Sequence, residues 1–242
     1  MSKLEDARRQ LRKYADKEKA RVLLRFFKTG PGEYAQGDIF LGVMVPFTRK
    51  VVKEFQDLPL SDVIKLLRSK IHEERLLALF ILVQQFNKAD TRVKEKIYKA
   101  YLANTKFINN WDLVDLSAPQ IVGGFLKDKD RKVLYKLAKS PLLWERRIAI
   151  LATFAFIRSG DFDDTFSITR LLLCDKEDLI HKACGWMLRE AGKRDAAAEE
   201  QFLRKNCKIM PRTMLRYAIE KFPQAKRKSF LKAKSQAIPV SH

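Results

Sequence analysis

The stretch Glu73-Glu-Arg-Leu-Leu-Ala-Leu79 has a counterpart in Glu145-Arg-Arg-Ile-Ala-Ile-Leu151, which lies 72 positions further along the chain (145 minus 73). Halfway between them lies Asn109-Asn-Trp-Asp-Leu-Val-Asp115. About one repeat length after Glu145 lies His181-Lys-Ala-Cys-Gly-Trp186, and about one repeat length further lies Arg212-Thr-Met-Leu-Arg-Tyr217. The spacing of about 35 residues is the period of stacked helix pairs. Five segments in register therefore predict an all-α protein with the architecture of an α-solenoid.

The rest of the chain agrees with helices. Apolar residues recur at helical spacing, as in Val63, Leu66 and Leu67, and strict alternation persists nowhere. Start signals are Pro46, Ser61 with Asp62, Asp161 and Pro211. Breaks are expected near residues 28–38, 56–59, 87–90, 104–109, 127–130, 140–141, 159–164, 175–177 and 206–211.

We expect residues 1–225 to form a single repeat domain. From Ala225 onward the chain is basic and then polar, beginning Lys226-Arg-Lys-Ser-Phe-Leu-Lys. This end could form a short last helix, but a solvated tail over residues 226–242 fits its composition better.

The charge balance is strongly positive. The 242 residues include 49 Lys and Arg against 29 Asp and Glu, which gives a formal net charge of +20. Such an excess costs self-repulsion, and a polyanionic partner relieves it. A generally basic, soluble surface is the alternative. The balance favours a nucleic-acid partner.

Cysteine usage points to a reducing compartment. The three cysteines, Cys174, Cys184 and Cys207, form no C-x-x-C pair and are too few for a disulfide framework. Residues 1–28 carry charges throughout and lack the apolar core of a secretory signal. The longest apolar stretch, residues 148–157, is too short to span a membrane. We expect a cytoplasmic monomer that associates with the nucleoid through DNA and not with a membrane.

The solenoid prediction has a geometric consequence. Equivalent helices of successive repeats line one concave surface, so equivalent positions become neighbours. The alignment makes Arg75, Trp111, Arg147 and Lys182 equivalent. Asp115 follows Trp111 by four residues and therefore shares a helix face with it.

A second set of candidates lies on one predicted helix. Lys182, Trp186, Arg189 and Lys193 follow one another at helical spacing, so three cations flank a tryptophan. Burying unpaired cations is costly, and an exposed basic face is expected. The alternative for Trp186, of equal weight, is an edge tryptophan packed against the next repeat with the lysine stems.

Asp115 is the candidate carboxylate. It is surrounded in sequence by Leu113, Val114 and Leu116, so it needs a partner or a water-filled cleft. A salt bridge to Arg147 is the structural alternative. Both roles are compatible.

Other catalytic chemistries have little support. His72 and His181 are far apart in sequence, and His181 with Cys184 is an insufficient metal site. The loop from Gly30 to Gly37 lacks the Gly-Lys-Ser/Thr of a phosphate-binding loop. We predict neither a metal ion nor a cofactor.

Four segments together resemble the AlkD family of alkylpurine DNA glycosylases, which are built from HEAT-like repeats. The resemblance covers roughly residues 5 to 225, with the segments in the same order and spacing. It implies a C-shaped solenoid whose basic concave face binds duplex DNA. The segments are Trp111-Asp-Leu-Val-Asp115, Trp144-Glu-Arg-Arg-Ile-Ala-Ile-Leu151, Lys182-Ala-Cys-Gly-Trp-Met-Leu-Arg-Glu190 and Met210-Pro-Arg-Thr-Met-Leu-Arg-Tyr-Ala-Ile-Glu220.

The resemblance also implies residue roles. Asp115 takes the place of the catalytic aspartate, Trp111 and Trp186 those of the tryptophans that contact the sugar, and Arg147 that of the phosphate-binding arginine. Lys182, Arg189, Lys193 and Arg216 complete the predicted DNA contacts. One position departs from the family, because Phe26 stands where a family member has an aromatic residue with a hydroxyl.

The implied reaction is hydrolysis of the N-glycosidic bond of 3-methyladenine or 7-methylguanine in double-stranded DNA, without extrusion of the base. Two alternatives stay open. A non-catalytic module could bind distorted or branched DNA with the same basic face. A protein-interaction scaffold is the commonest use of α-solenoids, but the net charge argues against it.

Overall fold

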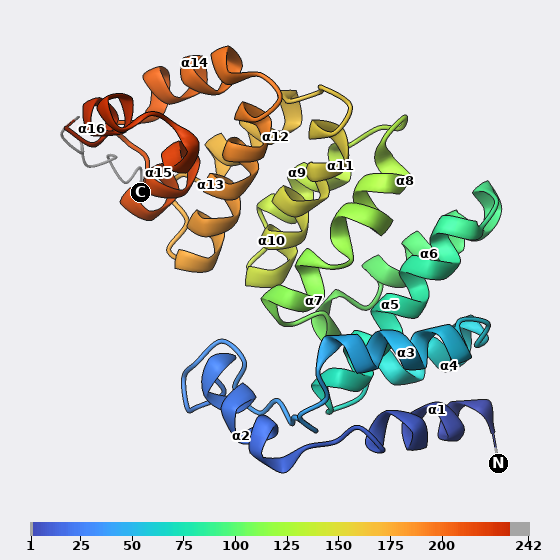
Figure 1. Cartoon of the computed structure of the whole chain (residues 1–242). Coiled ribbons are helices and arrows are strands. Elements are labelled where there is room, and N and C mark those ends of the chain that lie inside the picture. The colour runs from blue at the N-terminus through green and yellow to red at the C-terminus, as the bar shows by residue number, and fades with distance from the viewer. Residues whose placement is uncertain (1, 233–242) are drawn as a thin grey trace. The chain divides into compact units, whose positions relative to one another are not determined.

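The computed structural model describes residues 2–232, and its regular elements in this range are helices (Figure 1). One isolated parallel bridge pairs Ile39 with Ile71. The predicted all-α class is therefore confirmed. The solenoid arrangement and the basic concave face stay predictions. None of the helices in this range has both the length and the apolar character needed to cross a bilayer.

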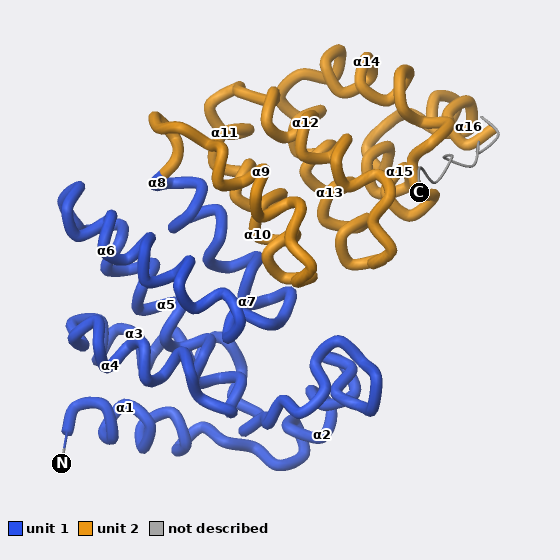
Figure 2. The backbone as a smooth tube through the Cα atoms, turned by 180° about the vertical axis from the view of Figure 1, so that it is seen from behind, with its two compact units in different colours: residues 1–125 blue, residues 126–242 orange. Residues whose placement is uncertain are grey.

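The chain divides into two compact units, residues 1–125 and 126–242 (Figure 2). The first unit contains α1 (Lys3–Arg12), α2 (Lys17–Phe26), α3 (Val45–Phe55), α4 (Leu60–Leu67), α5 (His72–Lys88), α6 (Thr91–Leu102), the 3-10 helix η1 (Thr105–Phe107), α7 (Trp111–Asp115) and the π-helix η2 (Pro119–Gly123). Helix α8 (Gly124–Leu126) follows η2 directly. The expected single domain over residues 1–225 stays a prediction.

The second unit is also helical. It contains α9 (Lys132–Ala138), α10 (Leu143–Ala152), α11 (Phe154–Ile157), α12 (Asp163–Leu171), α13 (Asp178–Gly192), α14 (Ala196–Asn206), α15 (Arg212–Ala218), the 3-10 helix η3 (Ile219–Lys221) and α16 (Gln224–Lys232). The five segments aligned in the sequence all fall at or near the first turns of α5, α7, α10, α13 and α15. The recurring sequence pattern thus marks the beginnings of helices.

Helix α5 is the centre of the first unit. It packs against α3, α4, α6 and η2. Its residues 76–82 are all buried, because a helix with neighbours on several sides is apolar around most of its circumference. Its first four residues are polar and nevertheless buried, and these residues organise the site described below.

The expected helix boundaries agree with the structure. Pro46 lies in the first turn of α3, and Pro211 directly precedes α15. Several other breaks were not expected, including those after α4 and after α13 and the break between α1 and α2. The break between α1 and α2 is marked by Asp16, whose carboxylate accepts the backbone N–H groups of Glu18 and Lys19 at 3.0 Å each. This is an N-cap, a signal that sequence alone provides.

In the second unit, α13 packs against α10, α12, α14 and α15. Gly185 permits the close approach of α13 to α15. A Cβ atom at Gly185 would lie 2.4 Å from the carbonyl oxygen of Met214 and 2.5 Å from Cβ of Tyr217. The backbones of α13 and α15 can meet here only because residue 185 has no side chain.

The basic C-terminal stretch begins as a helix. Residues 224–232 form α16, in which Phe230 is buried and packs 5.9 Å from the ring of Phe222. The structure therefore has the short last helix over this part of the expected tail. Residues 233–242 of the expected tail lie outside the described residues.

The close contact at Gly185 generates a stability prediction. We expect Gly185→Ala to lower the free energy of unfolding by about 1–3 kcal/mol despite the better helix propensity of alanine, because the new methyl group meets backbone. Gly30→Ala is the matched control, since its Cβ would meet only the flexible Glu33 side chain. Chemical denaturation measures both. Equal stability of the two variants would contradict the close α13–α15 packing.

Candidate functional site

Helix α7 is a single turn that carries the two candidate residues of the first unit. It begins after Asn110, whose side-chain oxygen accepts the backbone N–H of Trp111 at 2.8 Å. Trp111 and Asp115 are both partly exposed. Since they are four residues apart in a helix, they lie on the same side of the turn. The sequence prediction that these two share a face is confirmed.

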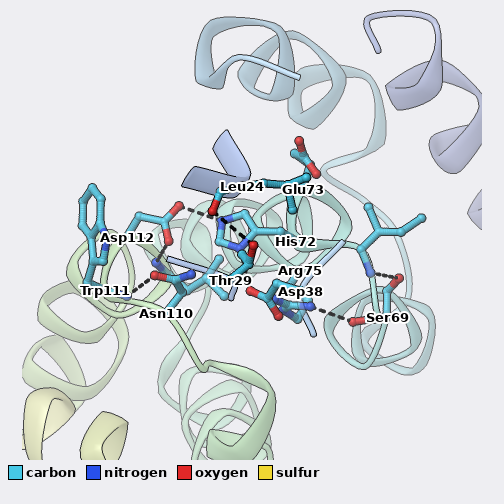
Figure 3. Close-up of polar contacts among 12 residues, drawn as sticks. Leu24, Thr29, Asp38, Ser69, His72, Glu73, Arg75, Asn110, Trp111 and Asp112 are labelled. Carbon is cyan, nitrogen blue, oxygen red and sulfur yellow. Dashed lines mark hydrogen bonds and ion pairs between the residues drawn. The ribbon is translucent and has the colours of Figure 1, made fainter. Parts of the chain in front are cut away.

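The two carboxylates of α7 have different surroundings. Asp112 is buried, and its Oδ2 lies 2.9 Å from Nε2 of His72 (Figure 3). Its Oδ1 accepts the backbone N–H of Leu113 at 2.9 Å. Asp115, one turn along, is partly exposed instead. Asp112 thus connects α7 to α5, whereas Asp115 lies nearer the surface.

His72 lies between two acidic residues. It is 2% exposed, and its Nδ1 is 3.4 Å from Oδ2 of Asp38. The same oxygen forms an ion pair of 2.7 Å with Nη2 of Arg75. Arg75 also donates to the carbonyl oxygen of Ser69 at 3.1 Å. Arg75 is therefore buried in the first unit with polar partners, although the repeat alignment equates it with Trp111.

These contacts shift two pKa values in opposite directions. For His72, burial disfavours the charged ring, but hydrogen bonds to Asp112 and Asp38 outweigh this, so its pKa is raised. For Asp38, burial disfavours the carboxylate, but the hydrogen bond from His72 and the charge of Arg75 outweigh this, so its pKa is lowered. His72 and Asp38 thus each stabilise the charged form of the other.

Aromatic rings connect this polar cluster to Trp111. The ring of Trp111 stacks on Phe27 with centroids 5.3 Å apart and an angle of 25°. Phe27 in turn stacks on Phe40 at 5.1 Å and lies 5.0 Å from the His72 ring. Phe26, 61% exposed, meets Trp111 edge-on at 5.8 Å. Phe26 is thus beside Trp111.

The first turn of α5 also binds the preceding loop. The carboxylate of Glu73 accepts the backbone N–H groups of Leu41, Gly42 and Val43 at 2.8–3.1 Å. Gly42 has φ +81°, and a Cβ there would lie 2.0 Å from the carbonyl oxygen of Asp16. The loop that carries Asp38 and Phe40 is therefore fixed against α5 and the start of α2.

The next residue of α5 binds the N-terminal helix. Glu74 is 1% exposed and accepts from Nε of Arg8 at 3.1 Å and from Nη2 of Arg12 at 2.8 Å. All four polar residues from His72 to Arg75 are thus buried with polar partners. The sequence motif Glu73-Glu-Arg75 therefore serves structure rather than an exposed surface.

In the second unit, Trp186 is oriented by an acidic residue. Its Nε1–H donates to Oε1 of Glu190 at 3.1 Å, and its ring centroid lies 6.1 Å from that of Phe154. The same carboxylate accepts from Nζ of Lys193 at 2.6 Å. Glu190 was not among the residues predicted from sequence, although it follows Trp186 by one helical turn, the spacing at which such a bond forms.

The predicted basic stripe on α13 is partly neutralised. Lys182 forms an ion pair of 2.8 Å with Asp178, and Arg189 pairs with Glu220. Lys193 pairs with Glu190 as described. The side chain of Lys182 is 40% exposed and that of Lys193 is 45% exposed, so both cations reach solvent. The stripe therefore alternates charges of both signs around Trp186.

The two remaining arginines differ in exposure. Arg147 is 5% exposed, and its Nη1 donates to the carbonyl oxygen of Leu179 at 2.5 Å, which connects α10 to the start of α13. Arg216 on α15 is exposed. A phosphate contact by either residue stays a prediction.

One hollow next to α7 was not anticipated. It has a volume of about 380 Å³ and includes Leu116, the residue after Asp115. Arg49 and Lys53 of α3 line it, and its lining contains no carboxylate. The remaining wall combines amide side chains with apolar ones, namely Gln56, Gln84, Asn87 and Gln120 with Val52, Phe80, Val83 and Leu116. The hollow therefore suits a ligand that has both an anionic group and an apolar part.

A family model and a solved structure both indicate similarity to DNA alkylation repair enzymes. The model of the family described as "DNA alkylation repair enzyme" matches residues 7–222. A solved structure described as "Predicted DNA alkylation repair enzyme from Enterococcus faecalis" has a TM-score of 0.67 and 16% sequence identity, and the match covers 87% of this chain and 97% of that chain. At this identity the structural likeness concerns the fold alone. No curated protein gives a significant match.

The bond between Trp186 and Glu190 can be tested spectroscopically. In a Trp111→Phe, Trp144→Phe background only Trp186 emits. We expect Glu190→Ala to increase quenching of this emission by acrylamide, because the indole N–H loses its acceptor. Glu200→Ala is the control, since Glu200 pairs with Arg204 and Lys226 instead of a tryptophan. Equal quenching in both variants would show that Glu190 does not orient the ring.

Proposed function

Because the chain belongs to the DNA alkylation repair enzyme family, we propose that it is a monofunctional DNA glycosylase. Its substrates are positively charged alkylated purines in duplex DNA, such as 3-methyladenine and 7-methylguanine. The enzyme hydrolyses the bond between the base and deoxyribose. Asp115 is the catalytic residue.

The observation that carries this proposal is the contrast between the two carboxylates of α7. Asp112 is buried and bonded to His72, so its role is structural. Asp115 is partly exposed on the same side of the turn as Trp111. A carboxylate beside an indole ring at the surface suits a substrate that develops positive charge.

The chemistry requires little beyond these groups. An alkyl group on N3 of adenine or N7 of guanine makes the base a cation, so the base leaves without a general acid. Its departure leaves positive charge on the deoxyribose. The Asp115 carboxylate stabilises that charge and orients or deprotonates the attacking water.

The tryptophans contribute through their electron-rich faces. Trp111 and Trp186 contact the sugar, where the ring faces attract the developing cation. Phe27 supports Trp111 by stacking, and Glu190 orients Trp186 by a hydrogen bond. Phe26 extends the apolar surface next to Trp111 and supplies no hydroxyl, so a polar contact there is absent.

Cationic side chains bind the phosphate backbone in this proposal. Arg147 contacts the phosphate next to the lesion. The flanking backbone is contacted by Lys182 and Arg189 of α13, by Lys193 directly after this helix, and by Arg216. Arg49 and Lys53 add a positive hollow beside α7. The net charge of +20 supports a polyanionic partner, and the affinity should fall steeply with salt concentration.

The lesion stays in the base stack during the reaction, because the enzyme contacts sugar and backbone instead of the base. Most glycosylases extrude the base into a pocket that limits its size. Without such a pocket, the enzyme accepts bulky cationic adducts. It acts poorly on neutral lesions, because a neutral base is a poor leaving group.

The decisive assay is release of 7-methylguanine and 3-methyladenine from alkylated duplex DNA. We expect wild-type protein to release both bases. Asp115→Asn should lower the single-turnover rate on the order of 10²- to 10³-fold, because it removes the charge that stabilises the transition state. Asp57→Asn, at an exposed position before α4, is the control and should keep the wild-type rate.

DNA binding is measured in parallel. Affinity of Asp115→Asn for duplex DNA should stay within a few-fold of wild type, which separates catalysis from binding. Wild-type protein that binds alkylated duplex without releasing a base would refute the glycosylase. Preference for a junction over a linear duplex in the same series would then favour the non-catalytic binding module.

A further inference from the structure

The cluster beneath α7 presents an unusual histidine. Both ring nitrogens of His72 face carboxylates, Nε2 at 2.9 Å from Asp112 and Nδ1 at 3.4 Å from Asp38. A neutral imidazole has one N–H donor, whereas the imidazolium has two. Only the charged ring can therefore donate to both acids, and His72 is buried, with 2% of its surface exposed.

Helix α7 depends on contacts of this kind. A five-residue helix is not stable by itself in water. The conformational entropy lost in forming its first turn exceeds the stabilisation from the hydrogen bonds of that turn. Its first residues are fixed by side chains. Asn110 accepts from the N–H of Trp111, and Asp112 connects α7 to His72.

The same histidine reaches Trp111 through stacked rings. The centroid of His72 lies 4.5 Å from that of Phe40 and 5.0 Å from that of Phe27, and Phe27 stacks on Trp111. His72 thus contacts the helix through Asp112 and supports the tryptophan through Phe27. Two independent routes lead from one side chain to the exposed face of α7.

We infer that His72, as a cation between Asp38 and Asp112, is a positioning residue that fixes α7 and thereby the orientation of Trp111 and Asp115 toward the substrate. This inference rests on the proposed function. His72 touches no reacting atom, so its effect is on the placement of the residues that do.

Loss of the charge should loosen α7. The charged groups that face His72 are Asp112 from α7, Asp38 from the loop before α3, and Arg75 from α5 itself, which opposes the charge. Because the pKa of His72 is raised, its contribution is complete below its ordinary pKa of 6.5 and is lost as the pH rises through the raised value. The contribution of Asp38, whose pKa is lowered, is present above 3.8 and lost as the pH falls through its lowered value.

The activity test compares the same substitution at two histidines. His72→Gln keeps a polar side chain but cannot carry charge. We expect it to lower the single-turnover rate of base release on the order of ten- to hundredfold, because small displacements of catalytic groups have effects of this size. Affinity for undamaged duplex should change less than twofold. His181→Gln, in the second unit, is the control and should keep the wild-type rate and affinity.

The pH profile separates positioning from a loss of folding. Wild-type activity should decline as the pH rises through the raised pKa of His72, and His72→Gln should lack that decline. Asp112→Asn is a second variant, which keeps the size of the side chain and an acceptor oxygen. If thermal melting shows that His72→Gln is unstable, Asp112→Asn takes its place in the assay. Its single-turnover rate should lie between the wild-type rate and the rate expected for His72→Gln.

A readout independent of catalysis uses Trp111 alone. In a Trp144→Phe, Trp186→Phe background, Trp111 emission should follow one titration at the raised pKa of His72, and His72→Gln should abolish it. Emission independent of pH, or a wild-type rate in folded His72→Gln, would overturn the inference. If wild-type protein releases no base, the proposed function fails, and this titration still decides whether His72 fixes Trp111.

Discussion

Burial of four consecutive polar residues at the start of α5 is the constraint on which the first unit depends. His72 binds Asp112 and Asp38, Glu73 binds the loop before α3, Glu74 binds α1, and Arg75 binds Asp38. Removing one partner of a buried ion pair costs about 3–5 kcal/mol, because the other charge stays buried without compensation. The four residues therefore specify one arrangement of α1, the loop and α7 around α5.

This arrangement explains how a five-residue helix can carry functional residues. The buried side of α7 is bonded to α5 through Asp112, and its partly exposed side carries Trp111 and Asp115. In the second unit, by contrast, Trp186 lies within the long helix α13 and needs only the local bond to Glu190. A local hydrogen bond thus orients Trp186, whereas contacts between residues far apart in the sequence orient Trp111.

Much of the fold could be predicted from sequence. Helical spacing, prolines at Pro46 and Pro211 and the recurring motif gave the helical class and most helix boundaries, since these are local properties. The site was predicted in part: Trp111 and Asp115 share a face, but Arg75 is buried and the α13 cations are paired. The roles of His72 and Asp112 could not be predicted, because their bond joins residues 40 positions apart and no local pattern specifies such a contact.

The most direct test of the account is the protonation state of His72, followed by nitrogen NMR of the imidazole ring between pH 5 and 9 in the full chain. Both ring nitrogens are expected to carry protons at pH 7, and the pKa of His72 is expected to lie above 6.5. A ring with one protonated nitrogen at pH 7, or a pKa below 6.5, would contradict this expectation, because a neutral His72 could not bind both Asp38 and Asp112.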